Sequence, residues 1–384
     1  MTAMLQALPV PDLSDAALAA VTAEVAATAE EYDRSGAIPV AGLEAAHRAG
    51  LLTATVAERF GGPAVSPLDA VRILVALGEG DPSVALLAAN TLATHQGQAA
   101  AGHWPEAAYA DLLARSATGP ALANAIRAEP ELGAPARGGL PKTAVRRTAD
   151  GWILNGHKAY ATGGSALAYH VVWVVTDDDR VGHLLVPGDS PGIGWIDTWD
   201  HLGLRASNTH DVVYDEVRVP LENFVEIPRG PDGVYRDPAA ATGLTSFGHP
   251  ALYVGVARAA RAAFVRYARE RVPTALGRPI AETERIQSVA GEIDAQVAQA
   301  ETLLHGALLR TDTAHLAQLS LLKVQIARSA VTAVQTAVAA LGNPALTRHQ
   351  PFERHLRDVL CVRVHPPQED TALLAAGRAL LLTP

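Results

Sequence analysis

The sequence has 384 residues, of which 49% are apolar and 18% are charged. This supply of apolar residues is enough for two or three packed sub-domains and excludes a chain that is disordered throughout. The net charge of −9, from 31 basic and 40 acidic residues, disfavours a surface that attracts phosphate backbones, so no nucleic-acid partner is expected.

Helical patterns occupy the N-terminal region as far as residue 115. Ser14 is a good N-cap for a helix that runs toward Arg34, and Gly36 beyond its end is typical of a C-cap. Alanine, which is frequent here, is the best helix former. Three further helices are predicted: one over 39–49, one from Ser66-Pro67 and one, which carries His95, from Asp81-Pro82.

The pattern changes near Pro120. Between 121 and about 220, short alternating apolar runs are broken by Gly, Asp and Pro, which is typical of strands. Three successive aspartates over 177–179 predict a hairpin turn. The runs that we expect to form antiparallel strands are 152–154, 169–175, 183–186 and 212–219.

Long helical patterns then return. They cover 252–270, 280–309, 314–341 and 366–382. Such lengths with modest charge favour a bundle that packs against itself or against other subunits. The sequence therefore predicts an α+β fold with three domains: an N-terminal all-α domain over 1–118, a central antiparallel β-domain (a sandwich or barrel) over 119–228 and a C-terminal four-helix bundle over 229–384.

Several classes of active site have no motif in this chain. It contains no glycine-rich dinucleotide fingerprint, no P-loop, no His-Glu-x-x-His and no Gly-x-Ser-x-Gly. The single Cys361 excludes cysteine-rich zinc sites and internal disulfides, and no metal site is expected from the histidine spacings. No apolar run long enough to span a bilayer and no basic-then-apolar N-terminus is present, so we expect a cytoplasmic protein without a membrane span.

Five local stretches agree with one known family. They are Ala49-Gly50-Leu51-Leu52 with Glu58-Arg59-Phe60-Gly61-Gly62, Asn155 to Gly163, Leu202 to Ser207, Gly277 to Glu282, and Pro351-Phe352-Glu353-Arg354 with Arg357-Asp358. In this order, over almost the whole chain, they resemble the acyl-CoA dehydrogenase superfamily. That resemblance implies the same layout of helices, small β-domain and four-helix bundle.

The resemblance also implies a bound flavin, either FAD or FMN, in a homotetramer. A flavin ring needs an aromatic or apolar wall and donors along its polar edge. By similarity, Tyr160 supplies the wall and Thr162 a donor near ring atom N5, with Gly163 closing the same segment. Asn124 is similar to an asparagine beside the flavin, and Arg278 lies in the stretch that resembles the flavin-facing loop.

The chain departs from the family's dehydrogenases at the catalytic base. Those enzymes remove a substrate proton with a glutamate. Here one of its two positions is Pro366, and the stretch at the other, 245–249, holds no acid. His365 and His95 instead resemble two histidines of the group D flavin monooxygenases, the dibenzothiophene and hydroxyphenylacetate types, and are our predicted catalytic residues. His365 precedes Pro366-Pro367, a predicted helix start whose positive end would keep the imidazole neutral.

Three functions follow as hypotheses. The first is a two-component monooxygenase that takes reduced flavin from a separate reductase and oxidises a small aromatic or heteroatom substrate with O2. The second is an acyl-CoA dehydrogenase with FAD, an electron-transfer flavoprotein as acceptor and a relocated base, Glu369 or Asp370. The third is a non-catalytic protein that keeps the flavin fold for assembly.

Overall fold

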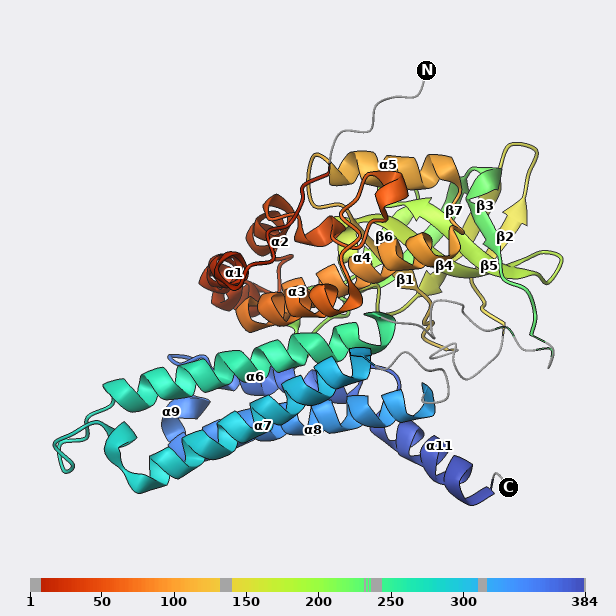
Figure 1. Ribbon diagram of the computed structural model, residues 1–384. Coiled ribbons are helices and arrows are strands. Elements are labelled where there is room, and N and C mark those ends of the chain that lie inside the picture. The colour runs from red at the N-terminus through yellow and green to blue at the C-terminus, as the bar shows by residue number, and fades with distance from the viewer. Residues whose placement is uncertain are drawn as a thin grey trace.

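The computed structural model describes residues 8–131, 140–230, 233, 235, 244–309 and 316–382. Figure 1 shows helices α1 to α5 and the β-strands in one half of the molecule, and helices α6 to α11 in the other. The N-terminal helices are α1 (Asp15–Ser35), α2 (Val40–Arg48), α3 (Pro67–Gly80), α4 (Pro82–Ala101) and α5 (Glu106–Ser116). The C-terminal helices are α6 (Leu244–Glu270), α7 (Glu284–Leu309), α8 (Leu316–Leu341), α9 (Asn343–Leu346), α10 (Phe352–Leu360) and α11 (Glu369–Leu382).

Capping residues set the boundaries of the N-terminal helices where the sequence predicts them. The Ser14 hydroxyl accepts a hydrogen bond from the amide of Ala17, and Gly36 ends α1 with φ +68°. Asp81 caps α4 by accepting from the amide of Ser83 at 2.8 Å. The four predicted N-terminal helices are thus confirmed, and α5 is an additional one.

The strands form one eight-stranded sheet in the order β6-β7-β3-β2-β4-β5-β8, with β1 paired to β4. The predicted runs fall within β3, β4, β5 and β7, and the hairpin over 177–179 joins β4 to β5. Most strand pairs are antiparallel, as expected, but β1 and β2 each pair with β4 in parallel. Alternating burial indicates which face a residue occupies, but it carries no information on strand direction. The strands are β1 (Leu122–Ile126), β2 (Ala144–Arg147), β3 (Trp152–Lys158), β4 (Leu167–Thr176), β5 (Val181–Pro187), β6 (Ile193–Ile196), β7 (Asp211–Val219) and β8 (Phe224–Glu226).

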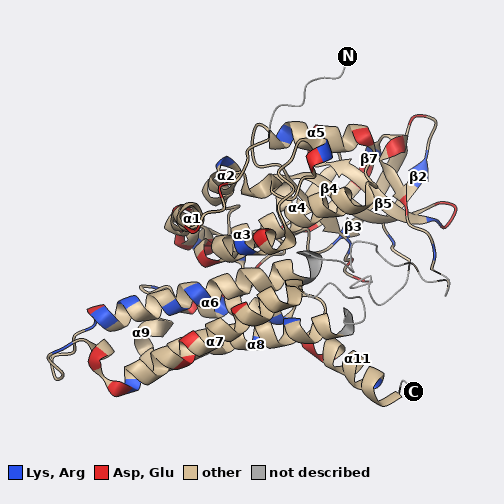
Figure 2. Cartoon of the chain, viewed as in Figure 1, with Lys and Arg blue, Asp and Glu red and all other residues tan. Residues whose placement is uncertain are grey.

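The C-terminal half is a bundle in which α8 packs against α6, α7 and α10, while α11 projects away from it (Figure 1). The segment Gln318–Leu341 of α8 is long and apolar enough to cross a membrane. It is also a core helix of the bundle, which explains its apolar composition. Figure 2 shows mainly basic residues along α6 and mainly acidic residues along α7. Arg258 and Arg261 of α6 form ion pairs with Glu301 and Asp294 of α7.

Helices α3 and α6 cross at close range, and glycine on each side makes this possible. A Cβ atom on Gly78 would lie 2.2 Å from the carbonyl oxygen of Leu252, and one on Gly255 would lie 2.3 Å from that of Val75. Because both obstacles are backbone atoms, a side-chain rotation cannot relieve the overlap. The contact joins the N-terminal helices directly to the bundle.

Replacing Gly78 with alanine should therefore destabilise the chain, by about 1–3 kcal/mol as for other overpacked cores. Chemical denaturation of the variant measures this free energy of unfolding. Gly291, on α7, is the matched control, because a Cβ atom there would have no neighbour within 4 Å. Alanine at that position should be neutral or stabilising by up to about 1 kcal/mol. Equal behaviour of the two variants would contradict the tight crossing.

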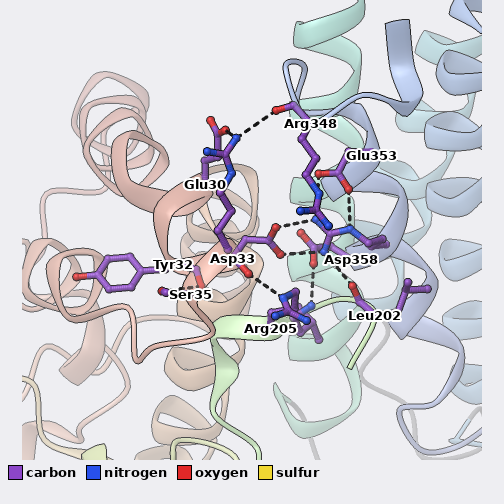
Figure 3. A network of polar contacts seen from close by, with 12 residues as sticks. Glu30, Tyr32, Asp33, Ser35, Leu202, Arg205, Arg348, Glu353 and Asp358 are labelled. Atoms are coloured by element: carbon purple, nitrogen blue, oxygen red, sulfur yellow. Dashed lines mark hydrogen bonds and ion pairs between the residues drawn. The ribbon is translucent and has the colours of Figure 1, made fainter. Parts of the chain in front are cut away.

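An ion network joins all three parts of the chain (Figure 3). Arg357 on α10 donates two hydrogen bonds to the carboxylate of Asp33 on α1, at 2.6 and 2.9 Å. Arg205, in the loop before β7, donates to the backbone carbonyl of Asp33 at 2.8 Å. The buried Asp358 accepts from the amide of Leu204 at 2.7 Å. The loop over 203–209 is thereby held between α1 and α10.

Candidate active site

The loop between β3 and β4 brings four of the predicted cofactor residues together. Asn124 on β1 donates through its side-chain amide to the carbonyl of Thr162 at 3.0 Å. Tyr160 has a left-handed backbone, with φ +57°, and its ring is 60% exposed. Gly163 has φ +105°, a conformation that disfavours other residues. Strained backbone and an exposed aromatic ring on a firmly held loop are typical of a binding site.

Hydroxyl groups support Thr162 from the loop over 203–209. Thr209 donates its hydroxyl proton to Oγ1 of Thr162 at 3.1 Å, and Ser207 lies 2.7 Å from Thr209. Thr162 is half-buried and keeps its own hydroxyl proton available to donate. An exposed aromatic face beside such a donor fits a flat ring system with a polar edge. The supporting roles of Ser207 and Thr209 were missed in the sequence, where no spacing links them to Thr162.

A second cluster lies at the start of α6. His249 and His365 lie against each other with ring centroids 4.5 Å apart. The hydroxyl of Tyr253 lies 3.1 Å from Nδ1 of His365. His249 and Tyr253 are four residues apart and so share one face of α6. The two stretches in which the resemblance places the catalytic glutamate therefore meet in space, and each contributes an imidazole.

Both imidazoles are held in the neutral form. Burial, and next the nearby Lys323, lowers the pKa of His249 to about 4. Burial, followed by His249 and Lys323, holds the pKa of His365 well below its usual range. The helix starts later than predicted, because α11 begins at Glu369, and burial is the largest cause of the lowered pKa of His365. Tyr253 keeps its proton because burial raises its pKa well above the usual value, so it can donate to His365.

His95 lies elsewhere, in an apolar core beneath α5. Its Nδ1 is 3.1 Å from the hydroxyl of Tyr109, and its ring is fully buried. Its Nε2 has no hydrogen-bond partner among the described residues. Burial lowers the pKa of His95 to about 4. The structure does not bring His95 into contact with His365.

Arg278 is also remote from the other predicted cofactor residues within one chain. It is exposed in the connection between α6 and α7, where its closest charged partner is Glu282 at 3.7 Å. Figure 1 shows this connection at the end of the bundle that points away from the sheet. A role for Arg278 in holding a cofactor beside Thr162 would require a second copy of the chain.

The acids proposed as a relocated base make their contacts with residues other than the histidine pair. Glu369 binds Arg328 at 2.6 Å on the side of α8 that lines a cavity of about 710 Å³. Asp370 accepts from the amide of Thr371 at the start of α11. In the described part of the chain, neither carboxylate has a hydrogen bond or ion pair with His249 or His365.

An exposed aromatic ring beside a hydroxyl donor is the arrangement that a flavin-dependent oxidoreductase needs to hold its cofactor. Comparison with known proteins leads to the same class of protein. The acyl-CoA dehydrogenase N-terminal, middle and C-terminal domain models match residues 12–105, 125–217 and 243–366. The chain belongs to the acyl-CoA dehydrogenase family, and the predicted three-domain fold is confirmed.

Relatives with different chemistry cover most of the chain. The putative acyl-CoA dehydrogenase YdbM of Bacillus subtilis is 31% identical over 90% of this chain and 91% of its own length. The L-evernosamine nitrososynthase of a Micromonospora species is 30% identical over 89% of this chain and 83% of its own. The solved structure of KijD3 with FMN and dTDP-3-amino-2,3,6-trideoxy-4-keto-3-methyl-D-glucose matches with a TM-score of 0.80 at 26% identity, over 96% of this chain and 93% of that one.

Proposed function

We propose that the chain is a flavin-dependent monooxygenase that oxidises a heteroatom or a small aromatic substrate with O2. The observation that carries this proposal is the contact between His249 and His365. A thioester dehydrogenase needs a carboxylate within reach of the substrate carbon, and the two stretches in which the resemblance expects that carboxylate carry His249 and His365 instead. The neutral state of both rings suits removal of a proton from an N–H or phenolic O–H group.

The loop around Thr162 is the part that would hold the flavin, FMN or FAD. Tyr160 offers its exposed ring as a wall, Thr162 offers a hydroxyl proton, and Asn124 fixes the backbone between them. When bound in reduced form, the flavin supplies the electrons with which O2 is activated. A separate flavin reductase would deliver it in that form.

His365 is the residue that we assign to proton transfer. In the tautomer with the proton on Nδ1, that nitrogen donates to the hydroxyl of Tyr253 at 3.1 Å, and Nε2 keeps a free lone pair that can accept a substrate proton. His249 lies alongside, with ring centroids 4.5 Å apart, and its contact helps to hold the His365 ring in place. The half-buried setting of both rings keeps bulk water from competing for the substrate proton.

The relatives narrow the substrate class. L-evernosamine nitrososynthase and the KijD3 complex both bear names that refer to amino sugars. We infer an amine nitrogen as the first heteroatom to test, ahead of phenols. The similarity to YdbM favours acyl-CoA oxidation as the second candidate.

The experiment supplies the chain with FMN or FAD, a flavin reductase and NADH in air, and offers dTDP-amino sugars and phenols separately. We expect a product that has gained oxygen by mass spectrometry, with oxygen uptake that depends on the substrate. In a parallel arm without oxygen, the oxidised flavin is titrated with a panel of acyl-CoA thioesters. We expect no bleaching.

Bleaching by an acyl-CoA would replace this proposal with thioester dehydrogenation. Purified chain that takes up neither FMN nor FAD would reject both candidates and favour an assembly role. Tyr160→Ala with Thr162→Val should weaken flavin binding, whereas His349→Ala, at an exposed position before α10, should leave it unchanged.

A further inference from the structure

Lys323, near the start of α8, is a buried lysine that binds the backbone beside the histidine pair. Its side chain is only 4% exposed. The ammonium group donates to the carbonyl oxygens of His365 and of Pro367, the latter at 3.0 Å. In the part of the chain that the structure describes, no carboxylate forms an ion pair with Lys323.

Such a placement is costly for stability. A buried ammonium without a carboxylate partner loses hydration that two carbonyl dipoles replace only in part. Burial lowers the pKa of Lys323 to about 8, so the group still carries a charge at neutral pH. An uncharged apolar residue would fill the same core position at lower cost. Retained buried charge beside other titratable groups is typical of functional sites.

We propose that Lys323 is the positioning residue of the histidine pair, and that its ammonium group holds the His365 backbone so that the imidazole meets His249 and Tyr253. This inference rests on the proposed function of that pair. The segment over 364–368 has no regular secondary structure, and the two carbonyls bound by Lys323 flank Pro366 within it. Without this anchor the segment loses its only cross-link to α8 next to His365 among the described contacts.

The charge of Lys323 has a second effect on the same pair. Besides Lys323, the titratable groups that act on one another in this cluster come from two parts of the chain. Helix α6 contributes His249 and Tyr253, and the segment from α10 onward contributes Asp358, Cys361 and His365. A positive charge beside His249 and His365 disfavours protonation of either ring. Lys323 thus holds the pair in place and adds to the effect of burial, which is the larger cause of the neutral state of both rings.

Two substitutions separate these effects. Lys323→Gln keeps an N–H donor for the carbonyls and removes the charge, whereas Lys323→Met removes both. Arg328→Met is the matched control. It also removes a cation from α8, but this cation binds Glu369 and does not contact the segment around His365. The readout on flavin-free chain is the pH dependence of carbethoxylation of His249 and His365 by diethyl pyrocarbonate, mapped by mass spectrometry. This reagent attacks the neutral imidazole.

We expect the reaction midpoint of both histidines to move to higher pH in Lys323→Gln and Lys323→Met, and to stay in place in Arg328→Met. In the oxygenation assay, Lys323→Met should lose on the order of 10-fold to 100-fold in kcat with little change in KM, and Lys323→Gln should lose less. An undiminished kcat in Lys323→Met would overturn the positioning role, and unchanged midpoints in Lys323→Gln would overturn the effect of the charge, even if Lys323→Met failed to fold. Because the carbethoxylation experiment needs no flavin, its result tests the role of Lys323 even if the proposed oxygenation reaction is wrong.

Discussion

Replacing His365 with alanine is expected to lower kcat by about 10²-fold to 10⁴-fold, the usual contribution of a positioned general base. His365 receives support from Tyr253, at 3.1 Å, and from the ring of His249. Since the hydrogen bond between Tyr253 and Nδ1 of His365 orients the ring, Tyr253→Phe should lose part of this factor. Steady-state kinetics with the amine substrate measures both losses.

The pH profile gives an independent check of the same assignment. An ordinary histidine, with a pKa of about 6.5, is protonated and useless as a base below that pH. Because the pKa of His249 is lowered to about 4 and that of His365 is also well below its usual range, both rings stay neutral as the pH falls through 6.5. We therefore expect kcat/KM to remain level from about pH 8 to about pH 5.5. A limb centred near 6.5 would show that the pair is not the base.

His349→Ala is the control for histidine loss as such, since that side chain is exposed and outside the cluster. It should retain full activity. If His365→Ala retained full activity as well, the base would have to be another group. His95→Ala would then be the next variant to test, because its Nε2 is a buried nitrogen without a partner in the described residues.

Replacing Arg357 with methionine is expected to destabilise the chain by about 3 kcal/mol, as for other broken buried ion pairs. Arg357 binds Asp33 at 2.6 Å, Glu353 at 2.7 Å and the carbonyl of Leu202 at 2.8 Å. Its loss leaves the carboxylate of Asp33 buried without its partner, and the loop over 203–209 loses one attachment to α10. Urea denaturation measures the change in the free energy of unfolding.

A double-variant cycle shows whether the unpaired carboxylate is the cause. Adding Asp33→Asn to Arg357→Met removes the uncompensated charge and should recover part of the lost stability. Arg34→Met is the control on α1, the helix that carries Asp33, because the ion pair of Arg34 with Glu30 is exposed and contributes less than about 1 kcal/mol to stability. A loss in Arg34→Met equal to that in Arg357→Met would contradict the role of the network.

The same network bears on the active site. The loop over 203–209 supports Thr162 through Ser207 and Thr209, and its Leu204 amide binds Asp358 on α10. Burial raises the pKa of Asp358 to about 7. The loop around Thr162 and the helix that leads to His365 are therefore attached to the same short segment.

The sequence alone was sufficient for the features that depend on short-range chemistry. Ser14, Gly36 and Asp81 mark helix ends because capping involves neighbours a few residues apart. Alternating apolar residues marked four of the strands, and the order of motifs indicated the acyl-CoA dehydrogenase fold. His365 could be singled out because it stands next to a position where an acid was expected.

Only the tertiary structure decided which distant residues meet. His249 lies in a stretch notable in the sequence only for its lack of an acid, and its contact with His365, 116 positions along the chain, appears only when α6 packs near the end of α10. No sequence pattern could have identified Lys323, because its partners are backbone carbonyls, which every residue possesses. The parallel pairing of β1 with β4 and the cause of the depressed histidine pKa values likewise depend on burial and long-range packing. Local sequence encodes caps and periodicity, whereas desolvation and charge proximity arise only in the folded chain.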